Sequence, residues 1–211
     1  MIERPDLVAL ALGVPPQTWA DLGFAVDAGA RSRIGGVELG LGGGATGITG
    51  WTLRGVVPAD EGIDGLPTTV VAAPRAQAEP YGHPNGAAAV DHVVVATPDH
   101  GRTLQAFVGA GFGVRAVRDA GSAERPLRQA FLLTRQALVE VVGPPEAAGD
   151  EPASFWGLTV AVTDLDATAA LLGERLGTVR DAVQPGRRIA TVRREAAGGL
   201  NLAFMDLRAP A

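Results

Sequence analysis

The sequence lacks cysteine and lysine altogether, and each absence excludes several kinds of catalytic chemistry. Without cysteine there is no thiolate nucleophile, no disulfide and no zinc or iron–sulfur site held by cysteine. Without lysine there is no Schiff base with a carbonyl substrate or with pyridoxal phosphate, because both require an amine side chain. All 18 basic residues are therefore arginines, which donate hydrogen bonds to anions but stay protonated.

Aromatic residues and excess positive charge are also missing. Only 5% of the residues are aromatic although 46% are hydrophobic, so the core must be built largely from Val, Leu, Ala and Ile. The formal net charge of −5 argues against a nucleic-acid partner, which needs a basic face. No apolar run approaches the length of a membrane span, and the first residues do not resemble a signal peptide. We therefore expect a cytoplasmic protein without a membrane partner, in a reducing compartment that suits a chain without cysteine.

Two stretches rich in proline, glycine and acidic residues divide the chain into three segments of similar size. One is a linker at 59–89, within which a short strand is expected at 68–72, and the other runs from 143 to 152. The sequence predicts a degenerate module at 1–58 and one domain at 90–207, made of two modules at 90–144 and 155–207. The first module has no counterpart, so it either packs against the other two or pairs across a homodimer.

The middle and last segments repeat one order of elements: a strand, a helix and then three strands. Each opens with a β-branched run, at 90–95 or 158–162, and an aspartate that can cap a helix follows, Asp99 or Asp164. These aspartates lie 65 residues apart, and the closing strands at 137–142 and 200–205 lie 63 apart. A nearly constant spacing indicates duplicated modules. We predict an α+β fold in which tandem βαβββ modules form a curved mixed sheet, shaped as a cup, with helices on the outside.

Strand alternation assigns side chains to the inside of this cup. One face is bulky and apolar, and it should pack on the helices. The other face is smaller and more polar, and it carries His92, Glu140, Thr159, Asn201 and Met205. A concave face of this kind makes a pocket, so we expect a small-molecule ligand or substrate. Thr159, Asn201 and Met205 are the residues of this face that we expect to contact it.

The repeat resembles the vicinal oxygen chelate superfamily, which includes glyoxalase I, bleomycin-resistance proteins and extradiol dioxygenases. The resemblance rests on the tandem pattern, on VDHVVV at 90–95, on VEVVGP at 139–144 and on VTDLD at 162–166. It covers 90–207 well and the first segment weakly. It implies the cup fold, but the superfamily spans lyases, isomerases, oxygenases and binding proteins, so it does not fix the activity.

In that superfamily each module can give one metal ligand from its first strand and one from its last. The matching positions are His92, Glu140, Gly157 and Ala203, and only the first two have side chains that can bind a metal. Because a catalytic metal usually has about three protein ligands, the resemblance implies a degenerate metal site. It favours a glyoxalase-like protein that binds or converts a small molecule without a metal.

Two alternatives remain for His92 and Glu140. One is a divalent-metal-dependent lyase, isomerase or dioxygenase, with Zn, Fe, Mn, Ni or Co at these residues and a third ligand from His83, Asp206 or another subunit. The other is metal-free catalysis, in which His92 acts as a general base oriented by Glu140, because histidine titrates near neutral pH. Beside these two functional roles, the residues could be relics that are hydrogen-bonded to each other or to a bound ligand.

Three further residues are candidates for ligand contacts. Arg188, with Arg187 beside it, could hold a carboxylate or phosphate group of a ligand. An equal alternative is that the two arginines only contribute charge to the protein surface. Trp156 lies at the expected rim and could stack on a ligand, with a place in the core as the alternative. Arg54 aligns with Glu140 in the degenerate first module and could project into a second cup.

Other conspicuous residues favour structural roles. The glycine run at 40–45 superficially matches a dinucleotide-binding motif, but a strand-like stretch follows it at 48–53, so we expect a hairpin turn. His100 should be exposed at a helix start. Trp19 and Trp51 are expected in the core.

Overall fold

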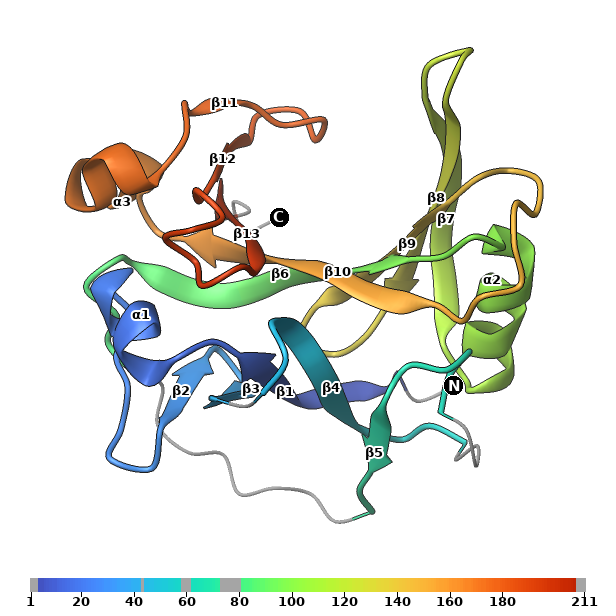
Figure 1. Cartoon of the computed structure of the whole chain (residues 1–211), viewed down its shortest axis with the longest axis horizontal. Coiled ribbons are helices and arrows are strands. Elements are labelled where there is room, and N and C mark those ends of the chain that lie inside the picture. Colours follow the sequence, from blue (N-terminus) through green and yellow to red (C-terminus); the bar gives the residue numbers. More distant parts are fainter. Residues whose placement is uncertain (1–3, 43, 58–61, 73–80, 208–211) are drawn as a thin grey trace.

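Two β-sheets make up the computed structural model, which describes residues 4–42, 44–57, 62–72 and 81–207. The larger sheet has eight strands in the order β11-β12-β13-β10-β6-β9-β8-β7, and the smaller has five in the order β2-β3-β1-β4-β5. Figure 1 shows the large sheet curled into a U that opens upward, with the small sheet beneath its convex side. No helix among the described residues is long and apolar enough to cross a membrane.

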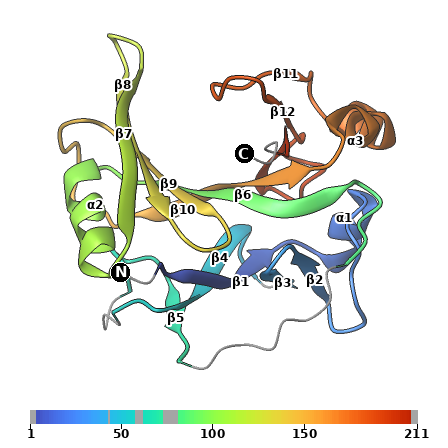
Figure 2. The ribbon, with the colours of Figure 1, turned by 180° about the vertical axis from the view of Figure 1, so that it is seen from behind.

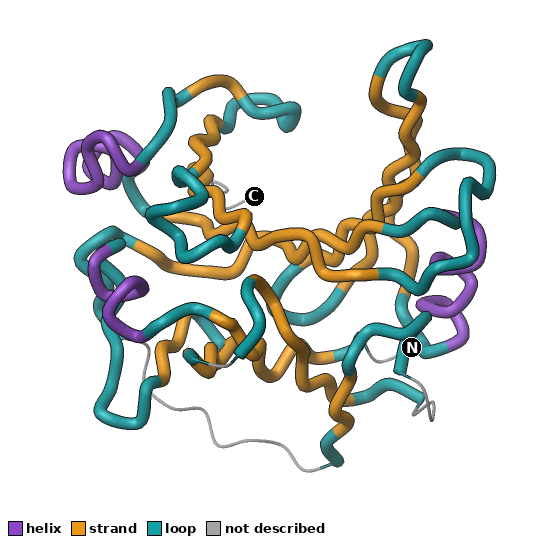
Figure 3. The backbone as a smooth tube through the Cα atoms, viewed as in Figure 1, coloured by secondary structure: helices purple, strands orange, loops and turns teal. Residues whose placement is uncertain are grey.

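The large sheet is built from the two predicted modules. The middle segment gives β6 (Ala87–Ala96), α2 (His100–Gly109), β7 (Gly113–Gly121), β8 (Pro126–Leu133) and β9 (Leu138–Gly143). The last segment gives β10 (Ser154–Val162), α3 (Leu165–Leu172) with a 3₁₀ turn (Gly173–Arg175), β11 (Arg180–Asp181), β12 (Arg188–Thr191) and β13 (Asn201–Asp206). α3 and α2 lie outside the U, on its left and right sides (Figure 3). The predicted tandem βαβββ cup is therefore confirmed.

Register repeats as well as element order. In the first module β6 runs parallel to β9 with His92 opposite Leu138, and in the second β10 runs parallel to β13 with Gly157 opposite Asn201. Both helices begin at the expected aspartates: Asp99 accepts a hydrogen bond from the amide of Arg102, and Asp164 from that of Ala167. Because β6 and β10 pair antiparallel, the two modules join into one continuous sheet.

The first segment and one strand of the linker form the five-stranded sheet. Its elements are β1 (Asp6–Gly13), α1 (Pro16–Asp21), β2 (Arg31–Ile34), β3 (Val37–Leu41), β4 (Gly47–Arg54) and β5 (Thr68–Val70). A strand within 68–72 is thus present. β2 and β3 are separated by a tight turn in which Gly35 has a φ of +57°. The hairpin expected at 40–45 is wrong, because β1 lies between β3 and β4 and both pair with it.

The few aromatic side chains gather where the two sheets meet. Trp51 of β4 contacts Phe155 of β10, with ring centroids 5.0 Å apart, and Phe24 stacks on Phe204 of β13 at 5.6 Å. Trp19 stacks on Phe24 at 4.0 Å. The bulky face of the large sheet therefore packs mainly on the five-stranded sheet (Figure 2). The sequence had led us to expect that this face packs on the helices, so that expectation is corrected. Of the two arrangements expected for the first segment, this chain shows packing against its own cup.

Candidate functional site

The inside of the U is a hollow of about 490 Å³, which we call the cup. Residues of β6, β8 and β9 from the first module and of β10, β11, β12 and β13 from the second line it, so both modules contribute to one site. Val94, Val142, Leu158 and Ile189 make much of the wall apolar. Polar groups are few, which is the usual composition of a small-molecule pocket.

A chain of polar contacts crosses the floor of the cup. Arg118 donates from Nε to Oε1 of Gln129 at 2.7 Å, and the Gln129 amide donates in turn to Oε1 of Glu140. The other carboxylate oxygen of Glu140, Oε2, lies 3.5 Å from Nε2 of His92. His92 and Glu140 are both buried, with 8% and 9% of their surface exposed. The sequence-derived pair therefore meets within the cup, supported from one side by Gln129.

Asp91 supports the other side of His92. The ring Nδ1 lies 2.8 Å from Oδ1 of Asp91, whose second oxygen forms an ion pair with the buried guanidinium of Arg187. Burial alone would raise the pKa of Asp91, but the hydrogen bonds from His92 and Arg187 outweigh it and lower the pKa to about 2. An ionised Asp91 accepts a hydrogen bond from Nδ1 of His92 and so fixes the orientation of the ring. The other ring nitrogen, Nε2, faces Glu140 and the cup.

Trp156 reaches the cup through a β-bulge. In the pairing of β10 with β6, Phe155 faces Val95 and Gly157 faces Val94, so Trp156 is the extra residue. Its neighbour Phe155 packs on Trp51, whereas Trp156 lines the cup and is 57% exposed. Asn201, also in the lining, donates to the Trp156 carbonyl at 2.7 Å and holds the bulge. Thr159 completes the expected residues that line the cup.

The remaining candidates lie elsewhere. Met205 shares a strand face with Ala203 but is fully buried and does not line the cup. Arg188 faces outward, where it binds Asp206 at 3.0 Å and Asp166 at 2.9 Å. Its neighbour Arg187 points inward but is occupied by Asp91 and by the carbonyl of Asp206.

Arg54 does not project into a cup. It pairs with the buried Asp6 of β1, and that carboxylate also lies 3.2 Å from Arg135 in the turn between β8 and β9. Its alignment with Glu140 is wrong in topology, because β4 is antiparallel to β1 whereas β9 is parallel to β6. These contacts tie the five-stranded sheet to the edge of the cup.

Two histidines outside the cup have structural surroundings. His100 is not exposed, as expected from the sequence, but 3% exposed, because the helix start packs against β9. The His83 ring accepts a hydrogen bond from the amide of Ala25 and contacts the carbonyl of Arg33 at 2.8 Å. Burial lowers the pKa of both rings, so each is neutral near pH 7.

The residues present do not fit a metal ion. Within the described ranges, no three His, Cys, Asp or Glu side chains come together as ligands. His83 and Asp206, the two proposed sources of a third ligand, are held by other partners away from the cup. At Gly157 a side chain is also excluded sterically, since a Cβ atom there would lie 2.7 Å from the carbonyl oxygen of Asn201.

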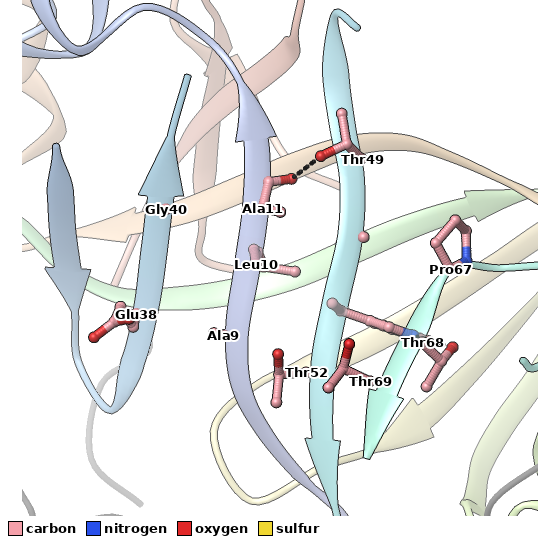
Figure 4. A pocket seen from close by; sticks show the side chains of 12 residues that line it. Ala9, Leu10, Ala11, Glu38, Gly40, Thr49, Thr52, Pro67, Thr68 and Thr69 are labelled. Atoms are coloured by element: carbon pink, nitrogen blue, oxygen red, sulfur yellow. Dashed lines mark hydrogen bonds between the residues drawn. The ribbon is translucent and has the colours of Figure 1, made fainter. Parts of the chain in front are cut away.

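A second hollow of about 510 Å³ lies on the outer face of the five-stranded sheet (Figure 4). Small and hydroxyl-bearing side chains line it, among them Thr49, which donates to the carbonyl of Ala11 at 3.2 Å. Among the described residues that line it, Glu38 is the only one with an ionisable side chain, and it lies 3.4 Å from Arg31 and 3.6 Å from Arg33. It therefore offers no acid–base pair, and the cup is the better candidate.

Three residues of the site were missed in the sequence: Asp91, Gln129 and Arg180. Asp91 adjoins His92, and strict alternation places neighbouring residues on opposite faces of a strand, so nothing in the pattern pointed to it. Gln129 could have been found from alternation along 127–133, where it shares a face with Phe131 beside the strand of Glu140. Arg180 lies on a strand of only two residues, which gives no periodic signal.

No protein-family model matches the sequence, and no curated protein matches it either. Among solved structures, a mutant of 4-hydroxymandelate synthase from Streptomyces coelicolor is similar over 98% of this chain and 93% of its own, with 14% identity and a TM-score of 0.66. Methylmalonyl-CoA epimerase from Mycobacterium tuberculosis is similar over 59% of this chain and 91% of its own, with 21% identity and a TM-score of 0.46. The likeness to the synthase confirms that the chain has the vicinal oxygen chelate fold.

Proposed function

We propose that the cup binds a small, partly apolar organic molecule without the help of a metal ion. The observation that carries this proposal is the occupation of His92 and Glu140 by protein partners, Asp91 and Gln129, with no third ligand beside them among the described residues. Two donors hold a divalent metal weakly, whereas a hollow of about 490 Å³ with apolar walls is large enough for a small organic ligand.

The test is a titration of the chelator-treated protein with N-phenyl-1-naphthylamine, a neutral dye whose fluorescence rises in apolar sites. We expect saturable binding that is unchanged when Zn, Mn, Fe, Ni or Co is added, because the apolar walls need no ion to hold the dye. Competition by small aromatic molecules and quenching of Trp156 locate the dye, since Trp19 and Trp51 are buried outside the cup. Binding that appears only with a stoichiometric metal would favour the metal-dependent alternative.

A second candidate function is proton transfer by His92. The contact with Asp91 fixes the ring so that Nε2 faces the cup, which is the arrangement of an oriented general base. A base at this place would remove a proton from a carbon or oxygen acid bound over the floor. Glu140, 3.5 Å away, would stabilise the protonated ring.

This candidate can be tested without knowing the natural substrate, by use of 5-nitrobenzisoxazole. A base removes its ring C–H proton, the N–O bond breaks and a cyanophenolate forms, so no co-reactant is needed. We expect turnover above that of buffer, and a loss of about 100-fold in His92→Gln, since general base catalysis contributes roughly that much. The matched control is Thr191→Val, which alters the lining without removing a base. Equal rates in the wild type and His92→Gln would reject the role of His92.

A further inference from the structure

The rim of the cup carries an arginine, Arg180, that has no acidic partner among the residues that the structure describes. Arg180 of β11 lies opposite Ile189 of β12, and cross-strand partners project to the same face of a sheet. Ile189 and Arg180 both line the cup, whereas the next pair, Asp181 and Arg188, projects to the outside. The guanidinium of Arg180 is therefore turned inward, and the carboxylate beside it in sequence is turned away.

The contacts of Arg180 differ from those of its neighbours in the same module. Arg187 is held by Asp91, and Arg188 by Asp166 and Asp206. Throughout the part of the chain that the structure describes, no hydrogen bond or ion pair engages the side chain of Arg180. The one carboxylate in the lining, Glu140, is committed to Gln129 and His92. A cation without a counterion at the mouth of a pocket is a ready partner for an anionic ligand group.

The order of the strands defines where the rest of such a ligand would lie. Arg180 stands at one end of the large sheet, Leu127 and Gln129 of β8 stand towards the other, and His92 and Thr159 lie on the two central strands. Trp156, exposed within the cup, offers a flat apolar surface. A ligand bound by Arg180 at one end would thus extend its apolar part over the floor, past His92.

We propose that the cup selects small organic anions and that Arg180 is the residue that recognises the anionic group, a carboxylate, sulfonate or phosphate. This inference rests on the proposed function, since it requires that the cup binds organic molecules. It adds a substrate class and a specificity-determining residue. The net charge of −5 makes non-specific binding of anions unfavourable, so selectivity for them must come from a local site.

Two dyes that differ in a single group test this inference. 8-Anilinonaphthalene-1-sulfonate is N-phenyl-1-naphthylamine with one added sulfonate, and both report binding by fluorescence. We expect the wild type to prefer the sulfonate, and Arg180→Ala to weaken its binding about tenfold while leaving the neutral dye unchanged, the size expected for one hydrogen bond to a charged group. Arg180→Lys should retain part of the preference, because it keeps the charge but loses the planar fork.

The matched control is Arg194→Ala, which removes the same charge from a loop outside the cup. Within the described ranges, the Arg194 side chain hydrogen-bonds only to the carbonyl of Gly199. If Arg180→Ala binds the sulfonate as tightly as the wild type does, or weakens both dyes equally, anion recognition by Arg180 is overturned while binding by the cup stands. If neither dye binds the folded wild type, both the inference and the proposed function are overturned. A near-ultraviolet circular dichroism spectrum unchanged from the wild type certifies that each variant is folded.

Discussion

Asp91→Asn should lower the free energy of unfolding by about 3 kcal/mol, although Asp91 does not line the cup. The substitution leaves the guanidinium of Arg187 buried without a counter-charge, and only 7% of that side chain is exposed. It also weakens the acceptor that orients His92, so a proton-transfer activity should fall with stability. Chemical denaturation at pH 7 measures the first effect, and the benzisoxazole reaction the second.

The stabilising effect of Asp91 should depend on pH in a defined direction. The pKa of this carboxyl is about 2 in the folded protein, below its usual value of 3.8. The unfolded chain therefore binds the proton more readily, so the contribution is fully present above about pH 4 and is lost as the pH falls through about 2. The difference in stability between the wild type and Asp91→Asn should accordingly shrink over that window.

Two controls separate the buried charge from general damage. Asp119→Asn breaks an ion pair with Arg128 that is largely exposed, and it should have little measurable effect. Combining Asp91→Asn with Arg187→Met removes both charges and should recover much of the lost stability, because an apolar side chain tolerates burial. A double variant as unstable as Asp91→Asn alone would show that the ion pair is not the cause.

The repeat was predictable because it is defined by local signals, the helix caps and β-branched runs, and by the nearly constant spacing between its two copies. Asp99 and Asp164 cap their helices within three residues of sequence, and the β-branched runs define the central strands. The spacing of 65 and 63 residues then brings equivalent positions into equivalent registers, with Val94 opposite Glu140 and Thr159 opposite Ala203. The concave placement of His92 and Glu140 followed from strand alternation within the aligned modules.

The first segment could not be predicted equally well, because its pairing is decided by distant residues. β1 takes β3 as a parallel partner and β4 as an antiparallel one, and no local feature of the glycine run at 40–45 distinguishes this from a hairpin. The turn between β2 and β3 was also hard to predict, because Gly35 and Gly36 separate two short stretches that together look like one strand. Packing beneath the cup through Trp51 and Phe155 selects the arrangement.

Part of the site was hidden because irregular strands break the rule of alternation. Bulges at Trp156 and near Asp91 shift side chains relative to strict alternation along β10 and β6. The burial of Arg187 depends on an acid 96 positions away, which no spacing argument detects. Conversely, Arg188 was a plausible anion-binding residue until Asp166 and Asp206 were seen to neutralise it.

Ala203→Glu should complete a set of three metal ligands in the cup. Ala203 lines the cup and occupies the position equivalent to Glu140, so a carboxylate there would face His92 and Glu140 across the floor. Three ligands are the usual number for a catalytic metal, and we expect the affinity for Zn or Mn to rise on the order of 100-fold or more over the wild type. Isothermal titration of chelator-treated protein measures this, and a further Glu140→Gln change should abolish the gain.

The equivalent change at Gly157 should fail for a steric reason, which makes it the matched comparison. A Cβ atom there would lie 2.7 Å from the carbonyl oxygen of Asn201, so Gly157→His should force β10 and β13 apart and cost about 2 kcal/mol without creating a site. Gly157→Ala isolates that cost from the imidazole. If Gly157→His instead binds metal and folds normally, the close approach is not a barrier. Asn201 also holds the bulge at Trp156, through its hydrogen bond to the Trp156 carbonyl. The close approach of β10 and β13 that excludes a metal-binding side chain at position 157 is therefore part of the same backbone geometry that turns the Trp156 indole into the cup.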